Sequence, residues 1–181
     1  RELLGAVTSA YDAYQFHEVA RAVHQFCVLD LSAFYLDALK DRLYTEAPAT
    51  VKRRCAQQAL YAILGTLVRA LAPILPVTAE EVWGEMRRAG WVSEPSVHLA
   101  SWPEAPAVEL DQASRQRWAT FRSVREIVMK ALEEQRGRGV IGSPLEAHVT
   151  LLVSDPQLQA LCETHRETLA EAFVVSGVAV R

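Results

Sequence analysis

The chain has 181 residues, half of them apolar, and a formal net charge of −3. This length allows one sizeable core, or a larger domain with a small one appended, and the composition excludes a disordered tail. No apolar stretch approaches the length that crosses a bilayer, so we expect a cytoplasmic protein without a membrane partner. Three widely spaced cysteines and five histidines without metal-ligand spacing predict reduced core thiols and no metal site.

Helical periodicity dominates the first two thirds of the chain. Apolar residues at steps of three and four predict two helices, whose stripes are Val7, Ala10, Tyr11 and Tyr14, then Val19, Ala22, Val23 and Phe26. A third helix is expected over residues 30–44, capped by Asp30 or Ser32. A long fourth helix should run from about Thr50 to Leu71, where the following prolines stop it.

The segment Thr78-Ala79-Glu80-Glu81 has the pattern of a capping box, which predicts a helix that begins there, continues through Ala89 and is closed by Gly90. Residues 93–112 are rich in Pro, Ser and acids. They predict a surface linker with a short extended piece at 97–99. One more helix is expected from about Ser114 to Arg136.

The pattern changes after Arg136, because the glycine-rich turn at 137–142 cannot continue a helix. Residues 147–153 are β-branched and apolar, as in a strand. Asp155 and Pro156 begin a helix expected to reach about Phe173, and 174–180 is typical of a second strand. We therefore predict a mainly α fold: an antiparallel helical bundle over 1–136, then a small α/β strand-helix-strand subdomain over 137–181, whose sheet we expect to need further chain.

Charge is unevenly distributed along this chain. Residues 115–138 hold seven Arg and Lys against three Glu, a local balance of +4, so the remainder carries −7. A basic segment on an otherwise acidic protein is what binding of a polyanion requires. On a helical wheel, one face is expected to be core and consists of Phe121, Val124, Ile127, Val128, Ala131 and Leu132. The edge of that face carries Arg115, Trp118, Arg122, Arg125, Met129 and Arg136.

An aromatic ring between guanidiniums suits unstacked RNA bases, because the ring can stack on a base while the arginines hold phosphates. Lys52, Arg53 and Arg54 form a second basic cluster at a helix start, where the dipole disfavours cations. The candidate RNA-binding residues are Arg53, Arg54, Arg115, Trp118, Arg122, Arg125, Arg136 and Arg138. Two alternatives stay open. For the segment at 115–138, Trp118 simply widens the hydrophobic face and the arginines pair with acids of neighbouring helices. For the cluster at 52–54, the negative charge of Glu46 compensates the cations.

The other three tryptophans, Trp83, Trp91 and Trp102, are interpreted as anchors of the core or of a domain junction. The glycines at 137, 139 and 142 do not form a phosphate-binding loop, because no strand precedes them and no Lys-Ser or Lys-Thr follows. No catalytic set of residues is predicted.

Several stretches of the sequence resemble one family. Residues 30–44, followed by the double-proline junction at 71–83, resemble the anticodon-binding domain of class I aminoacyl-tRNA synthetases. The junction alone would fit valyl and leucyl enzymes as well. Asp30-Leu31-Ser32, the run from Lys40 to Tyr44, and Ile141-Gly142-Ser143-Pro144-Leu145-Glu146-Ala147 favour the isoleucyl type.

The resemblance implies a domain that binds the anticodon stem-loop of an isoleucine-accepting tRNA, within a ligase that attaches isoleucine using ATP and Mg²⁺. The His-x-Gly-His and Lys-Met-Ser-Lys-Ser type sequences of such active sites are absent here. We therefore expect this fragment to be inactive alone, to need no cofactor, and to act with the catalytic domain of its parent chain. Any zinc module would lie in parts not present. An alternative of another class is a helical scaffold that binds protein.

Overall fold

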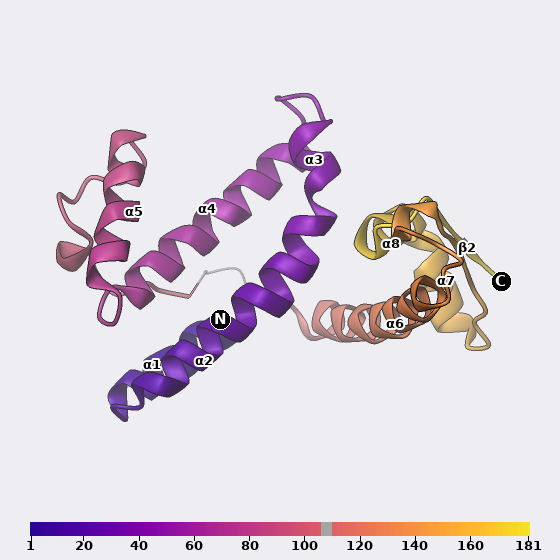
Figure 1. Ribbon diagram of the computed structural model, residues 1–181, viewed down its shortest axis with the longest axis horizontal. Helices are drawn as coiled ribbons and strands as arrows, with labels where there is room; N and C mark the ends of the chain where they lie inside the picture. The colour runs from indigo at the N-terminus through magenta and orange to yellow at the C-terminus, as the bar shows by residue number, and fades with distance from the viewer. Residues whose placement is uncertain (106–109) are drawn as a thin grey trace. The chain divides into compact units, whose positions relative to one another are not determined.

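The computed structural model describes residues 1–105 and 110–181 (Figure 1). Internal contacts divide the chain into two units. The first comprises Arg1–Ala33 and the chain from Asp41 to the undescribed segment, and the second comprises Phe34–Lys40 and the chain after that segment through Arg181. The second unit therefore joins a short stretch of the early chain to all the C-terminal elements.

The first unit begins with two helices that pack together, α1 (Glu2–Asp12) and α2 (Phe16–Gln25). Apart from Tyr14 and Phe26, the two apolar stripes form a core cluster with part of α4, and its buried members are Val7, Ala10, Val19, Val23 and Ala70. Tyr14 does not belong to this stripe, contrary to the prediction. It sits in the tight turn between the helices with φ 56°, and 81% of it is exposed.

Beyond α2 the chain continues without a break into a π-helix, Phe26–Leu36, and then reaches the short α3 (Lys40–Tyr44). The predicted helix start at Asp30 or Ser32 is therefore wrong, because both residues lie inside the π-helix. A π-helix is rare, and apolar spacing of 3.6 residues carries no signal for its wider turn.

The long predicted helix is confirmed as α4 (Val51–Leu71), with the Thr50 hydroxyl accepting a hydrogen bond from the Arg53 N–H at 3.4 Å. The next helix, α5 (Pro76–Arg88), begins earlier than expected, with a proline in its first turn. Thr78 is therefore inside the helix and does not cap it. Gly90 closes the helix as predicted, with φ +73°.

Glu80, an intervening residue of the predicted capping-box segment, binds the chain that follows α5. Its carboxylate accepts hydrogen bonds from the Ser96 hydroxyl at 2.9 Å and the Val97 N–H at 3.0 Å. These bonds hold a 3₁₀ turn, Val97–Leu99, where an extended piece was predicted. Val97 is buried against α4 and α5. The part of the predicted linker at 106–109 lies outside the described residues.

The second unit contains α6 (Gln112–Gly137), a 3₁₀ turn (Pro144–Glu146), β1 (His148–Leu151), α7 (Pro156–Thr164), α8 (Arg166–Phe173) and β2 (Gly177–Val180). The two strands pair in parallel, from His148 opposite Gly177 to Leu151 opposite Val180. The helix predicted between the strands is interrupted at His165. The second strand starts later than expected, because Val174 takes the left-handed conformation that ends α8.

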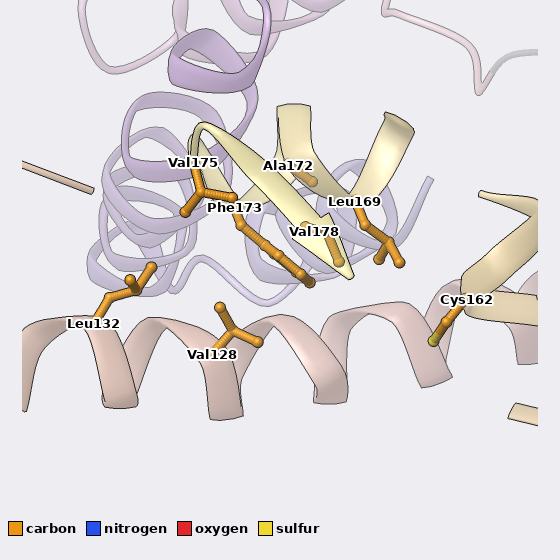
Figure 2. Close-up of a cluster of buried hydrophobic side chains, with 8 residues drawn as sticks. All are labelled: Val128, Leu132, Cys162, Leu169, Ala172, Phe173, Val175 and Val178. Carbon is orange, nitrogen blue, oxygen red and sulfur yellow. The ribbon is translucent and has the colours of Figure 1, made fainter. Parts of the chain in front are cut away.

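One cluster of buried side chains fills the second unit (Figure 2). Val128 and Leu132 point from α6 toward Phe173 and Val178, and Phe173 has no exposed surface. The predicted mainly α fold with a small α/β part is confirmed. The domain boundary predicted at 136/137 stays a prediction, as does the antiparallel arrangement of the bundle. The contacts nevertheless group α6 with the C-terminal elements.

Across the described ranges, no helix has both the length and the hydropathy of a membrane span. In those same ranges, His, Cys, Asp and Glu do not gather in groups of three or more that could hold a metal ion.

Candidate nucleic-acid interface

The basic segment begins at a well-capped helix end. The Asp111 carboxylate accepts a hydrogen bond from the Ser114 N–H at 2.6 Å. Hydrogen bonds from Ser114 lower the pKa of this carboxyl, and the positive charge of Arg117 lowers it further. Two arginines are held against the same turn, because Arg117 donates to the Ser114 hydroxyl at 2.8 Å and Arg115 Nε donates to the Leu110 carbonyl at 3.0 Å.

Trp118 lies partly inside the second unit and partly on its surface. Its ring stacks on Phe121 with centroids 5.1 Å apart and an interplanar angle of 10°, and it lies 6.0 Å from the ring of Phe34. It also lines a cavity of about 220 Å³ between α6, α7 and α8. Because 43% of Trp118 is still exposed, the ring can pack inward and also offer a surface to a ligand.

Arg125 is bound within its own unit. Its guanidinium carbon lies 4.4 Å from the centroid of the Phe34 ring, a cation–π contact. Its Nε donates to the Ala172 carbonyl at 3.2 Å. Burial lowers the pKa of this side chain, and the negative charges of Asp37 and Glu126 act in the opposite direction. Its position favours a role in holding Phe34 and α8 to α6, and its role in RNA binding stays a prediction.

The buried face of α6 is rotated relative to the predicted one. Val128 and Leu132 are buried as expected, but Ile127 is 71% exposed and Ala131 is exposed as well. The buried arc has moved toward Arg125 and Met129, where Phe34, α8 and β2 supply the opposite surface. Those partners are distant in sequence, so a helical wheel of α6 alone could not place them.

The remaining arginines of this segment are solvent-exposed. Arg136 pairs with Glu133 at 3.4 Å within the helix. Arg122 and Arg138 are exposed, and no side-chain hydrogen bond or ion pair is found for either within residues 1–105 and 110–181. Their charges are therefore available to an outside anion.

Arg53 and Arg54 belong to the first unit, at the start of α4. Arg53 donates to the backbone carbonyl of Glu46 at 2.8 Å, which partly explains a cation at a helix start. Arg54 is exposed, and its side chain makes no hydrogen bond or ion pair with any described residue.

Two features were missed in the sequence. Phe34 and Asp37 lie beside Arg125, a long-range arrangement with no local signal. Trp91 was predicted to be an anchor, but 53% of it is exposed, and it pairs with Tyr61. Trp83 is buried as predicted, whereas Trp102 is 39% exposed.

The chain is similar to proteins named isoleucine–tRNA ligase from several bacteria. The protein from Brevibacillus brevis is 45% identical over 175 residues, which cover 94% of this chain and 18% of that protein. The one from Natranaerobius thermophilus is 39% identical over 181 residues, which cover 100% of this chain and 19% of that protein. The one from Syntrophotalea carbinolica is 43% identical over 177 residues, which cover 98% of this chain and 19% of that protein.

The chain thus spans less than one fifth of the length of the relatives it matches. A family model described as the anticodon-binding domain of tRNA ligase matches residues 1–151, which include all of the first unit and the whole of α6. This chain therefore belongs to the family of anticodon-binding domains of tRNA ligases.

Proposed function

We propose that this chain binds the anticodon stem-loop of an isoleucine-accepting tRNA, as one domain of an isoleucine–tRNA ligase. The observation that carries the proposal is the similarity of the whole chain to proteins with that name. The complete ligase would use ATP and Mg²⁺ and work in the cytoplasm. Its catalytic domain and any zinc module would lie outside these 181 residues.

The domain's contribution to catalysis would be positional. When the domain binds the anticodon arm, the acceptor end of the same tRNA meets the distant active site intramolecularly. This raises the effective concentration of the acceptor end at that active site. A tRNA with another anticodon loses that binding energy. No side chain of this chain is required to react.

The proposed interface on the second unit is the outer edge of α6. Arg122 and Arg138 are exposed and have no partner among the described residues, and Arg115 and Arg136 make only local contacts. Trp118 supplies an exposed ring beside them. Such a surface holds phosphates by charge and one unstacked base by its aromatic face. Arg53 and Arg54 offer a second basic contact on the first unit.

Arg122→Ala tests this proposal in the 181-residue chain. Binding of the anticodon stem-loop of isoleucine tRNA, measured by fluorescence anisotropy over a range of salt concentrations, should weaken. The slope of log affinity against log salt should fall by about one, because one phosphate contact releases about one counterion. Thermal unfolding should be unchanged, since the replaced side chain is exposed.

Arg21→Ala is the matched control, because Arg21 is an exposed helical arginine that pairs with Glu18 and lies outside the basic segment. It should leave both affinity and salt slope unchanged. If Arg122→Ala behaves like Arg21→Ala, the RNA contact does not include this edge of α6. If the wild-type chain binds a stem-loop with a changed anticodon equally well, the proposed recognition is wrong.

A further inference from the structure

The first unit carries an exposed aromatic pair that the basic segment does not explain. Tyr61 of α4 and Trp91, just after α5, lie with ring centroids 5.7 Å apart at 87°, and the Tyr61 hydroxyl donates to the Trp91 carbonyl at 2.9 Å. Tyr61 is 43% exposed and Trp91 is 53% exposed. Because the Trp91 indole is held by Tyr61 and about half of its surface is exposed, a ligand can stack on it.

The backbone around Trp91 fixes the position of this ring. Gly90 takes φ +73°, its N–H donates to the Arg87 carbonyl, and the Trp91 N–H donates to the Met86 carbonyl at 2.9 Å. This pattern is the Schellman motif, which ends a helix in a defined geometry. This backbone geometry, together with the ring contact with Tyr61, restricts the indole, so a ligand that stacks on it loses little conformational entropy.

Polar groups that suit a nucleotide lie along the same face of α4. Arg54, Gln57, Gln58 and Tyr61 are spaced at i, i+3, i+4 and i+7, the spacing of one helix face. All four are exposed. Within residues 1–105 and 110–181, no hydrogen bond is found for the side chain of Arg54, Gln57 or Gln58.

A groove of about 730 Å³ runs beside these residues. Its lining includes both glutamines, Tyr61 and Trp91, and every other lining residue is an aliphatic side chain, from Leu31 and from α4. A second hollow on the other side of the pair is more polar and contains Arg69 and Glu94. The groove thus combines aliphatic side chains, free amides and aromatic rings.

None of the described residues that line this groove is charged, but Arg54 lies one helical turn before Gln57 and Gln58 on α4. The sequence of α4 holds Lys52, Arg53, Arg54 and Arg69 and no acidic residue. A purely apolar protein segment would gain nothing from the exposed guanidinium and amides, which would stay hydrated. A nucleotide would satisfy them, because its base has donors and acceptors on its edge, a face that stacks, and an attached phosphate.

We infer that Tyr61 and Trp91 form a second RNA contact that holds one unpaired nucleobase, with Gln57 and Gln58 on the base edge and Arg54 on a neighbouring phosphate. This inference rests on the proposed tRNA-binding function and extends it from the basic edge of α6 to α4. The ligand is single-stranded RNA, such as the loop of a stem-loop. Bases inside a duplex are already stacked and would not bind.

The test uses the 181-residue chain and two probes, a short single-stranded RNA of mixed sequence and the same strand annealed to its complement. Trp91→Leu should weaken binding of the single strand by roughly tenfold or more, the effect of losing one stacked base. Its effect on duplex binding should be absent. Tyr61→Phe should bind like the wild type, because it keeps the ring and removes only the hydroxyl.

The double variant Gln57→Ala, Gln58→Ala tests the same groove if Trp91→Leu disturbs the fold. These are exposed helix positions where Ala is the better helix former, so the variant should remain folded. It should weaken single-strand binding by several-fold. Trp102→Leu is the matched indole control, because Trp102 packs against Tyr11 and lies outside the groove, and it should leave affinity unchanged.

The two proposals fail in different ways. If Arg122→Ala weakens stem-loop binding while Trp91→Leu and the double glutamine variant do not, the groove is not an RNA site and the proposed function stands. If the groove binds an apolar peptide and not RNA, the groove variants likewise leave RNA affinity unchanged and the groove is rejected as an RNA site. If the groove variants weaken binding and Arg122→Ala does not, the inference stands and the α6 edge is rejected. No binding of any RNA by the wild type would reject both.

Discussion

Arg122 and Arg125 are three residues apart on α6, yet their surroundings differ. Arg125 contacts the Phe34 ring and the Ala172 carbonyl, whereas Arg122 is exposed. A helical wheel of the sequence places both on one edge, because it contains no information about Phe34 or α8. The residue type and the helix were predictable here, but the role of each arginine depended on long-range packing.

This difference predicts opposite effects of two single substitutions. Arg125→Ala should lower the free energy of unfolding by about 1–3 kcal/mol, because it removes a cation–π contact and leaves the Ala172 carbonyl without this donor. Arg122→Ala should change stability by less than about 0.5 kcal/mol, as expected for an exposed position. Urea unfolding followed by circular dichroism measures both.

Arg125→Lys serves as the control for charge in this comparison. Lysine keeps the positive charge but has neither the planar fork nor its Nε donor, so it should recover only part of the lost stability. If Arg125→Ala unfolds at the same urea concentration as the wild type, the contacts with Phe34 and Ala172 do not stabilise the unit.

At the scale of elements, helix ends were predicted most accurately from the sequence where a single residue determines the backbone conformation. Gly90 ends α5, as expected from the freedom of glycine to take positive φ. Thr50 caps α4 for a reason that is also local. The π-helix after α2 and the start of α5 were predicted wrongly. In both cases the apolar pattern fits more than one helix geometry, and packing or a first-turn proline decides between them.

Two glycines near the end of α5 make this point testable. Gly84 lies inside the helix and Gly90 has φ +73°, and a Cβ added at either position would meet nothing within 4 Å. Any effect of alanine must therefore come from the backbone. Gly84→Ala should stabilise the protein by about 0.5–1 kcal/mol, and Gly90→Ala should destabilise it by about 1 kcal/mol or more.

Thermal unfolding of the two variants under identical conditions gives the comparison. Gly90→Ala should also reduce single-strand RNA binding, because Gly90 sets the helix end that positions Trp91. Gly90→Asn should be milder than Gly90→Ala, since Asn tolerates the left-handed conformation better. Equal melting temperatures for Gly84→Ala and Gly90→Ala would contradict the left-handed geometry at residue 90.

At the scale of the whole molecule, buried apolar residues fall into separate clusters. The cluster around Phe173 draws only on the second unit, and the two clusters around Val19 and Trp83 draw only on the first. The sequence predicted the change from helices to a small α/β part. It did not predict that α6 shares its core with that part, because the partners of Val128 and Leu132 follow the glycine turn.

Separate cores predict separate loss of structure. Phe173 has no exposed surface, so Phe173→Ala should cost about 3–5 kcal/mol, and the cost should fall on the second unit. Hydrogen exchange measured by mass spectrometry should show faster exchange in α6, α8 and β2 and unchanged exchange in α1 and α2. Val19→Ala, at a position with 0% exposure in the first unit, should show the reverse pattern. If either substitution accelerates exchange equally in both units, the chain unfolds as one cooperative body, and the division of its core into independent clusters has no energetic meaning.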